Sequence, residues 1–104
     1  MSHEKDKIKE LLLEMNFSDK EASVYLATLS LGRGTASKIA REAHIHRTTV
    51  YEILGELFDK GLVTLSGREP KQEYVAESPD NLKLLLANEL EKKKDELKDA
   101  EQVL

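Results

Sequence analysis

The sequence predicts a mainly α-helical fold, with a three-helix core, an extra N-terminal helix, a two-stranded β-hairpin and a long C-terminal helix. Apolar residues recur at helical spacing along most of the chain. Residues that start and stop helices separate these segments, and two short β-branched runs flank residues 66–72. A length of 104 residues fits one small domain.

The composition indicates a protein that folds in water. Hydrophobic residues make up 39% and charged residues 35% of the chain, and there is no cysteine to form a disulfide or a thiolate metal site. No apolar run approaches the roughly 18 residues of a membrane span. The first residues are charged where a signal peptide would be apolar. We therefore expect a cytoplasmic protein with no membrane partner.

Two helices are predicted in the first third of the chain. Helical spacing of apolar residues predicts the first over residues 4–15. Ser18 and Glu21 then have the spacing of a capping box, which predicts a second helix from this point. Gly32 is expected to end it, because glycine tolerates the left-handed conformation found there. The following Arg33-Gly34 is expected to continue the turn.

Two more helices follow, separated by a sharp bend. Thr35 can cap a short helix over residues 36–43, and another periodic run begins at Arg47 and stops at Gly61. The residues expected on the inward face of this run are Val50, Ile53, Leu54, Leu57 and Phe58.

The last third predicts a hairpin and one long helix. Residues 62–65 and 73–76 resemble strands joined by a polar tip, and Pro79 stands where a helix can begin. A helix over residues 80–104 would be about 37 Å long at 1.5 Å per residue, too long to lie wholly on a small domain. We therefore expect part of it to project.

This order of elements is that of a winged helix-turn-helix, in which the second helix of the pair enters the DNA major groove. We expect residues 1–79 to form this domain and residues 80–104 a separate helical element. The net charge is -4, yet four basic residues and a single acid lie between Arg33 and Tyr51. Positive charge is thus concentrated where such a fold meets DNA.

The helix from Arg47 carries the candidate DNA contacts. At 100° per residue, Thr48, Glu52 and Gly55 face outward, and Arg47 and Tyr51 lie on one flank. Arg47 could bind guanine or hold a phosphate, and Thr48 and Thr49 could contact either. Tyr51 could donate to a phosphate or simply pack.

Two stretches carry a resemblance to a known family. The run FSDKEASVYLATLSLGRGTASKIAREAHIHRTTVYEILGELFDKGLV and the wing GREPKQEYVAESP resemble the amino-terminal winged-helix domain of TrmB-like transcriptional regulators. These are archaeal and bacterial sugar-responsive repressors and activators. The resemblance covers roughly residues 10–85 of the chain.

The resemblance implies that a dimer binds operator DNA, with the helix from Arg47 as reader and the wing on the flanking backbone. The residues expected at this interface are Ser37, Lys38, Arg41, His46, Arg47, Thr48, Thr49, Tyr51, Arg68 and Lys71. Longer family members carry a sugar-binding domain beyond the last helix, where this chain ends, so no small-molecule ligand is assigned. Gly55 departs from the larger polar residue usual in the family.

His44 and His46 form a His-x-His pair that could bind a metal. His3 lies far away in the sequence and no cysteine is present, so we favour a turn residue, a helix cap or a phosphate neighbour. We expect no cofactor and no metal. With three histidines and no nucleophile motif, we also expect no enzyme activity.

The last helix carries a weak leucine repeat that can join two copies. The leucines that define it are Leu86, Leu90, Leu97 and Leu104. Lys93 and Ala100 occupy the intervening heptad positions, so packing against the chain's own domain is the alternative. For function, the alternative to DNA binding is a winged-helix module that binds proteins, which the net negative charge favours.

Overall fold

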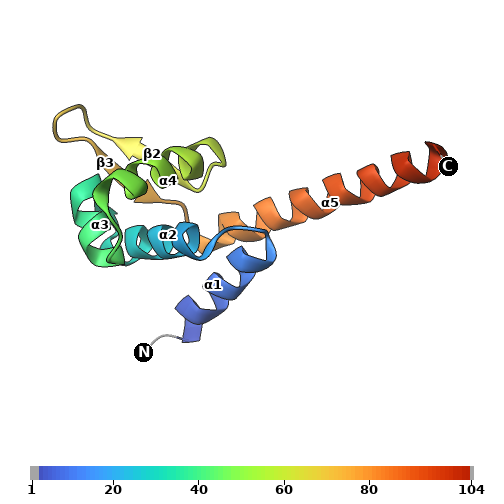
Figure 1. Ribbon diagram of the computed structural model, residues 1–104, viewed down its shortest axis with the longest axis horizontal. Coiled ribbons are helices and arrows are strands. Elements are labelled where there is room, and N and C mark those ends of the chain that lie inside the picture. Colours follow the sequence, from blue (N-terminus) through green and yellow to red (C-terminus); the bar gives the residue numbers. More distant parts are fainter. Residues whose placement is uncertain (1–2, 104) are drawn as a thin grey trace.

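A computed structural model describes residues 3–103, and Figure 1 shows its arrangement. Helices account for most of the chain, and α2 lies centrally against α1, α3 and α4. The long helix α5 extends away from this body, while the hairpin of β2 and β3 projects on the opposite side. The elements are α1 (His3–Glu14), α2 (Asp19–Leu31), β1 (Arg33–Gly34), α3 (Ala36–Ala43), α4 (Arg47–Asp59), β2 (Val63–Ser66), β3 (Glu73–Ala76) and α5 (Pro79–Val103).

The predicted signals at the ends of α2 are confirmed. The Ser18 hydroxyl accepts a hydrogen bond from the Glu21 amide at 3.0 Å, and the Glu21 carboxylate accepts one from the Ser18 amide at 2.8 Å. This reciprocal pair satisfies two amides that the first helical turn leaves free. Gly32 ends the helix with φ of 79°. The boundaries of α2 are therefore fixed by local sequence.

One apolar core holds α1, α2, α3, α4 and the start of α5 together. Its fully buried members include Leu12 of α1, Tyr25 of α2, Ile39 of α3, Leu54 of α4 and Leu82 of α5. Because each helix contributes to the same core, their relative positions are set mainly by burial of apolar surface.

The sheet has three strands in the order β1-β3-β2, all antiparallel. Thr64 lies opposite Val75 in the predicted hairpin, and Arg33 pairs with Val75 from the other side. The turn predicted for Arg33-Gly34 is therefore wrong, since these residues form the short strand β1. A two-residue strand has no internal period, and its partner lies about forty residues further along the chain.

The described part of α5 has two different surroundings. Leu82 is buried and Leu85 packs against the core, but every residue from 87 to 100 is exposed. The prediction that part of the last helix projects is confirmed (Figure 1). Leu104 lies outside the described residues. Between residues 3 and 103, no helix is both long enough and apolar enough to cross a membrane.

Candidate nucleic-acid interface

The junction between α3 and α4 is built from three local contacts. The Thr35 hydroxyl accepts a hydrogen bond from the Lys38 amide at 3.3 Å and caps α3, as predicted. His44 ends α3 in the left-handed conformation, with φ of 58°. The Ile45 amide then donates to the Ala40 carbonyl at 3.1 Å, so the chain turns sharply before α4. Residues at the start of α3 and at the start of α4 line one crevice on the same side of the protein.

His46 serves as the cap of α4. Its Nδ1 accepts a hydrogen bond from the Thr48 amide at 3.2 Å, so this nitrogen is unprotonated while the cap forms. This is one of the alternatives that the sequence left open for the histidine pair. Within the described residues, no group of three or more His, Cys, Asp or Glu side chains is arranged to hold a metal ion.

The inward face of α4 is buried as predicted, with one exception. Val50, Ile53, Leu54 and Leu57 are buried, but Phe58 is 46% exposed, so its predicted place on the inward face is wrong. Phe58 lies about 80° around the helix from Val50, at the edge of the apolar stripe. Sequence periodicity cannot tell whether such an edge is covered.

The outward side of α4 is open to solvent. Arg47, Thr48 and Tyr51 are exposed, while Thr49 is half-buried. Nothing lies within 4 Å of the place where a Cβ would stand on Gly55. The side of α4 predicted to meet a partner therefore presents a cation, hydroxyl groups, the exposed carboxylate of Glu52 and bare backbone.

The wing places two exposed cations at its tip. Arg68 and Lys71 are joined by a hydrogen bond from the Lys71 amide to the Arg68 carbonyl at 2.8 Å. Gly67 permits this turn with φ of 82°, and a Cβ there would stand 3.3 Å from the Lys71 carbonyl oxygen. The tip is thus a tight turn with positive charge on its surface.

Helix α3 contributes the remaining predicted residues. Lys38 and Arg41 are exposed and line a shallow hollow together with Leu31 and Glu42, whereas Ser37 is half-buried. Arg33 differs from them, since its guanidinium lies 3.8 Å from the Glu73 carboxylate. Its charge is therefore partly compensated within the sheet.

A crevice of about 160 Å³ lies where the wing meets the starts of α3 and α4. Ser37, Arg47 and Tyr51 line it, so the structure brings together three of the predicted residues from two helices. The wing side adds residues that the sequence did not single out, namely Glu69, Pro70, Gln72 and Tyr74. Strand alternation could place Tyr74 on one face of β3, but could not tell which face turns toward α4.

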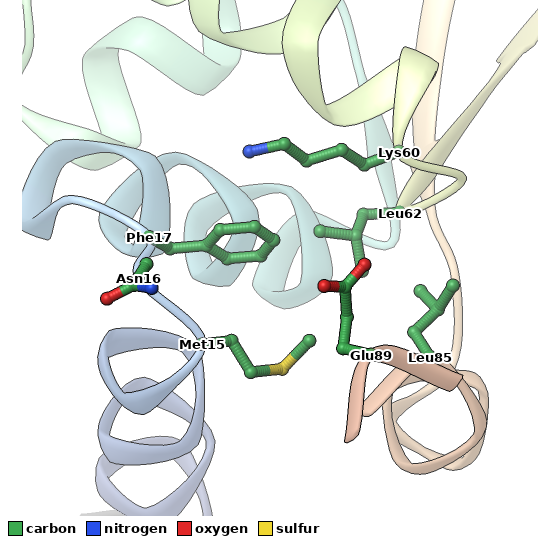
Figure 2. A pocket seen from close by; sticks show the side chains of 7 residues that line it. All are labelled: Met15, Asn16, Phe17, Lys60, Leu62, Leu85 and Glu89. Atoms are coloured by element: carbon green, nitrogen blue, oxygen red, sulfur yellow. The ribbon is translucent and has the colours of Figure 1, made fainter. Parts of the chain in front are cut away.

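A second hollow, of about 320 Å³, lies between the α1–α2 connection, the end of α4 and α5. Figure 2 shows Met15, Phe17 and Leu85 around it, with Glu89 reaching in from α5. Lys60 is already engaged here, since its ammonium lies 4.3 Å from the Phe17 ring centre and 3.5 Å from the Glu21 carboxylate. These contacts tie the end of α4 to the start of α2.

The fold and the open side of α4 define the class: a winged helix-turn-helix protein, as the sequence predicted. The particular family follows from comparison with known proteins. Residues 11–80 match the family model described as sugar-specific transcriptional regulator TrmB. The match covers more than half of the chain, so the chain belongs to this family of transcriptional regulators. No match to a curated protein sequence was found.

Solved structures share this fold. The archaeal chromatin protein TrmBL2, described as showing a novel mode of DNA binding, is similar over 95% of this chain, with a TM-score of 0.83 and 26% identity. The chain spans 40% of that protein. ST1889 from Sulfolobus tokodaii covers 86% of this chain and 94% of its own, with a TM-score of 0.70 and 21% identity.

The same fold recurs in a MarR family transcriptional regulator from Silicibacter pomeroyi DSS. It has a TM-score of 0.60 and 16% identity, covering 88% of this chain and 62% of its own. At this identity the likeness shows the fold alone.

Proposed function

We propose that the chain binds double-stranded DNA in the cytoplasm and regulates transcription as a homodimer. In this proposal α4 enters the major groove from its Arg47 end, and the wing lies along the flanking backbone. Family membership points to a regulator rather than to a catalyst. The description of TrmBL2 as a DNA-binding chromatin protein agrees with this assignment.

One observation carries the proposal. Arg47, Thr48 and Tyr51 lie on the open side of α4, next to a wing whose exposed tip carries Arg68 and Lys71. A helix fits the major groove, and exposed cations beside it can neutralise phosphates on the flanking backbone. Lys38 and Arg41 on α3 add exposed cations, and the proposed interface also includes Ser37 and the His46 cap. These side chains supply both base-edge and phosphate contacts.

The acidic residues in the rest of the chain favour one orientation of the protein on DNA. The net charge is -4, so a duplex is attracted to the cationic edge and repelled elsewhere. Orientation of the protein on DNA thus follows from its charge distribution.

Dimerisation is assigned to the projecting part of α5. Leu90 is 54% and Leu97 66% exposed, while Leu86 is partly buried. Large apolar side chains in a row along a helix are buried when a second helix packs against them. A dimer would present two copies of α4 to half-sites about one helical turn, roughly 34 Å, apart.

The proposal is tested by fluorescence anisotropy with short labelled duplexes, starting at low salt. Binding is expected, and the affinity should fall steeply as salt rises because phosphate contacts release counterions. Arg47→Ala should weaken binding about tenfold or more and lower the salt slope by about one. Lys94→Ala, an equal change of charge on exposed α5, is the matched control and should have little effect.

The alternative, a winged helix that binds proteins, draws on the acidic charge and on exposed Phe58. It predicts that no duplex binds even in dilute buffer. Equal binding by wild type and Arg47→Ala would instead contradict the assigned role of α4.

A further inference from the structure

The crevice between the wing and the two helix starts has a definite chemistry. The residues that line it include Arg47, which carries a guanidinium, Ser37, Tyr51 and Tyr74, which carry hydroxyl groups, and Gln72, which carries an amide. All of these groups can donate hydrogen bonds, and one of them is a permanent cation. Such a set matches the oxygens of a phosphodiester, because guanidinium binds phosphate strongly and hydroxyl groups complete its shell.

One residue in the crevice, Glu69, carries an acidic side chain instead of a donor or a cation. Glu69 stands on the wing side of the same crevice as Arg47, and its carboxylate can only accept hydrogen bonds when ionised. It makes no ion pair with any residue between 4 and 100. A phosphate entering the crevice would therefore meet a carboxylate that is not held in an ion pair.

The electrostatics of Tyr74 agree with this geometry. Burial raises the pKa of the Tyr74 phenol, and the neighbouring Tyr51 phenol and Glu69 carboxylate raise it further. Tyr74 thus stays protonated and can donate its hydrogen. Tyr51, Tyr74 and Glu69 therefore lie near one another in the crevice.

We propose that this crevice is a phosphodiester subsite of the DNA interface, and that Glu69 opposes the bound phosphate and so limits affinity. The inference rests on the proposed function. It adds Tyr74 and Gln72 to the groups that hold the backbone, and it makes the wing a source of repulsion as well as attraction. A like charge beside a bound phosphate weakens binding most at low salt, where screening is least.

The first test compares Glu69→Gln with wild type in duplex binding at low salt. We expect Glu69→Gln to bind about three- to tenfold more tightly, because one repulsive charge is removed from the subsite. Glu10→Gln is the matched control: it makes the same change of net charge on exposed α1 and should shift affinity by less than about twofold. Tyr74→Phe should weaken binding while circular dichroism and the unfolding midpoint remain close to wild type.

The second test locates the phosphate. Duplexes that carry one neutral methylphosphonate at successive positions should reveal a position that weakens wild-type binding. At that position the penalty should disappear in Arg47→Ala and grow in Glu69→Gln.

The outcomes separate this inference from the function on which it rests. If wild type binds DNA and Glu69→Gln binds equally or more weakly, the subsite is wrong and the proposed function stands. If wild type binds no duplex at all, both the phosphodiester subsite and the proposed DNA-binding function are wrong.

Discussion

The phenol of Tyr25 donates a hydrogen bond of 2.6 Å to the backbone carbonyl of Glu77, 52 residues further along the chain. Tyr25 lies on α2 in the centre of the core, and Glu77 stands between β3 and α5. This bond therefore joins the helical body to the point where α5 leaves it. Burial, together with the Glu77 carboxylate, raises the pKa of Tyr25 to about 12.

Tyr25→Phe should lower the free energy of unfolding by about 1 to 2 kcal/mol, because the partly buried Glu77 carbonyl loses its donor. Urea unfolding at pH 7 measures the change, with the exposed Tyr51→Phe as a control that should differ little. The folded-state pKa is above the ordinary value of 10.0, so the bond's contribution is complete below pH 10 and declines as pH rises toward 12. A difference between wild type and Tyr25→Phe that stayed constant up to pH 12 would contradict this assignment.

Glu21 should contribute to stability in a way that depends on acid pH. Burial would raise its pKa, but the Ser18 amide, the Lys60 ammonium and the neighbouring Glu56 and Ser18 side chains outweigh this and lower the pKa below 4.5. The contribution is therefore present above pH 4.5 and lost as pH falls through the lowered value.

The matched variant is Glu21→Gln, which keeps an acceptor for the Ser18 amide but carries no charge. It should be less stable than wild type at pH 7, and the difference should shrink as pH falls below 4.5. Urea unfolding across this range provides the measurement. A difference that is independent of pH would show that the charge of Glu21 has no role.

The ends of the helices were predictable, because their signals are local. Ser18 with Glu21, Thr35 and Gly32 act on amides or dihedral angles within a few residues of themselves. Strand β1 was not predictable, since two residues become a strand only when β3 arrives beside them. Exposure of Phe58 was missed for a similar reason, because coverage at the edge of a stripe depends on tertiary packing.

The candidate site likewise combines residues that the local sequence could predict with residues that are brought together only by tertiary packing. Helical periodicity identified Arg47, Thr48 and Tyr51 as outward or flanking residues, and the structure leaves them exposed. Glu69 and Tyr74 meet Arg47 only because the wing folds back beside α4. No spacing in the sequence encodes that proximity.

Gly55→Ala should raise the free energy of unfolding by about 0.5 to 1 kcal/mol. Gly55 lies within α4, and an added Cβ would meet nothing within 4 Å, so the gain in helix propensity is not opposed by a clash. Thermal or urea unfolding measures the effect. Gly61→Ala is the contrasting control, because φ of +79° makes alanine strained there and should destabilise the protein. A loss of stability in Gly55→Ala would contradict the open space seen around it.

Leu90→Glu combined with Leu97→Glu should convert a dimer into a monomer, because charges cannot remain in an apolar contact between helices. Sedimentation velocity at micromolar concentration measures the state of each variant. Leu84→Glu is the matched control, since Leu84 is also exposed, at 62%, but lies about 120° around α5 from Leu90. The Leu84→Glu variant should remain dimeric. A monomeric wild type at this concentration would remove the assigned role of α5.

The most direct measurement is a titration of the isotopically labelled chain with a short duplex, followed by amide chemical shifts in NMR. The largest changes are expected at residues 47–52 of α4 and 68–74 of the wing, with smaller ones around Lys38 and Arg41. Amides of α1 and of the exposed part of α5 should change little. Changes centred on those helices, or no change at low salt, would contradict the proposal that α4 and the wing bind DNA.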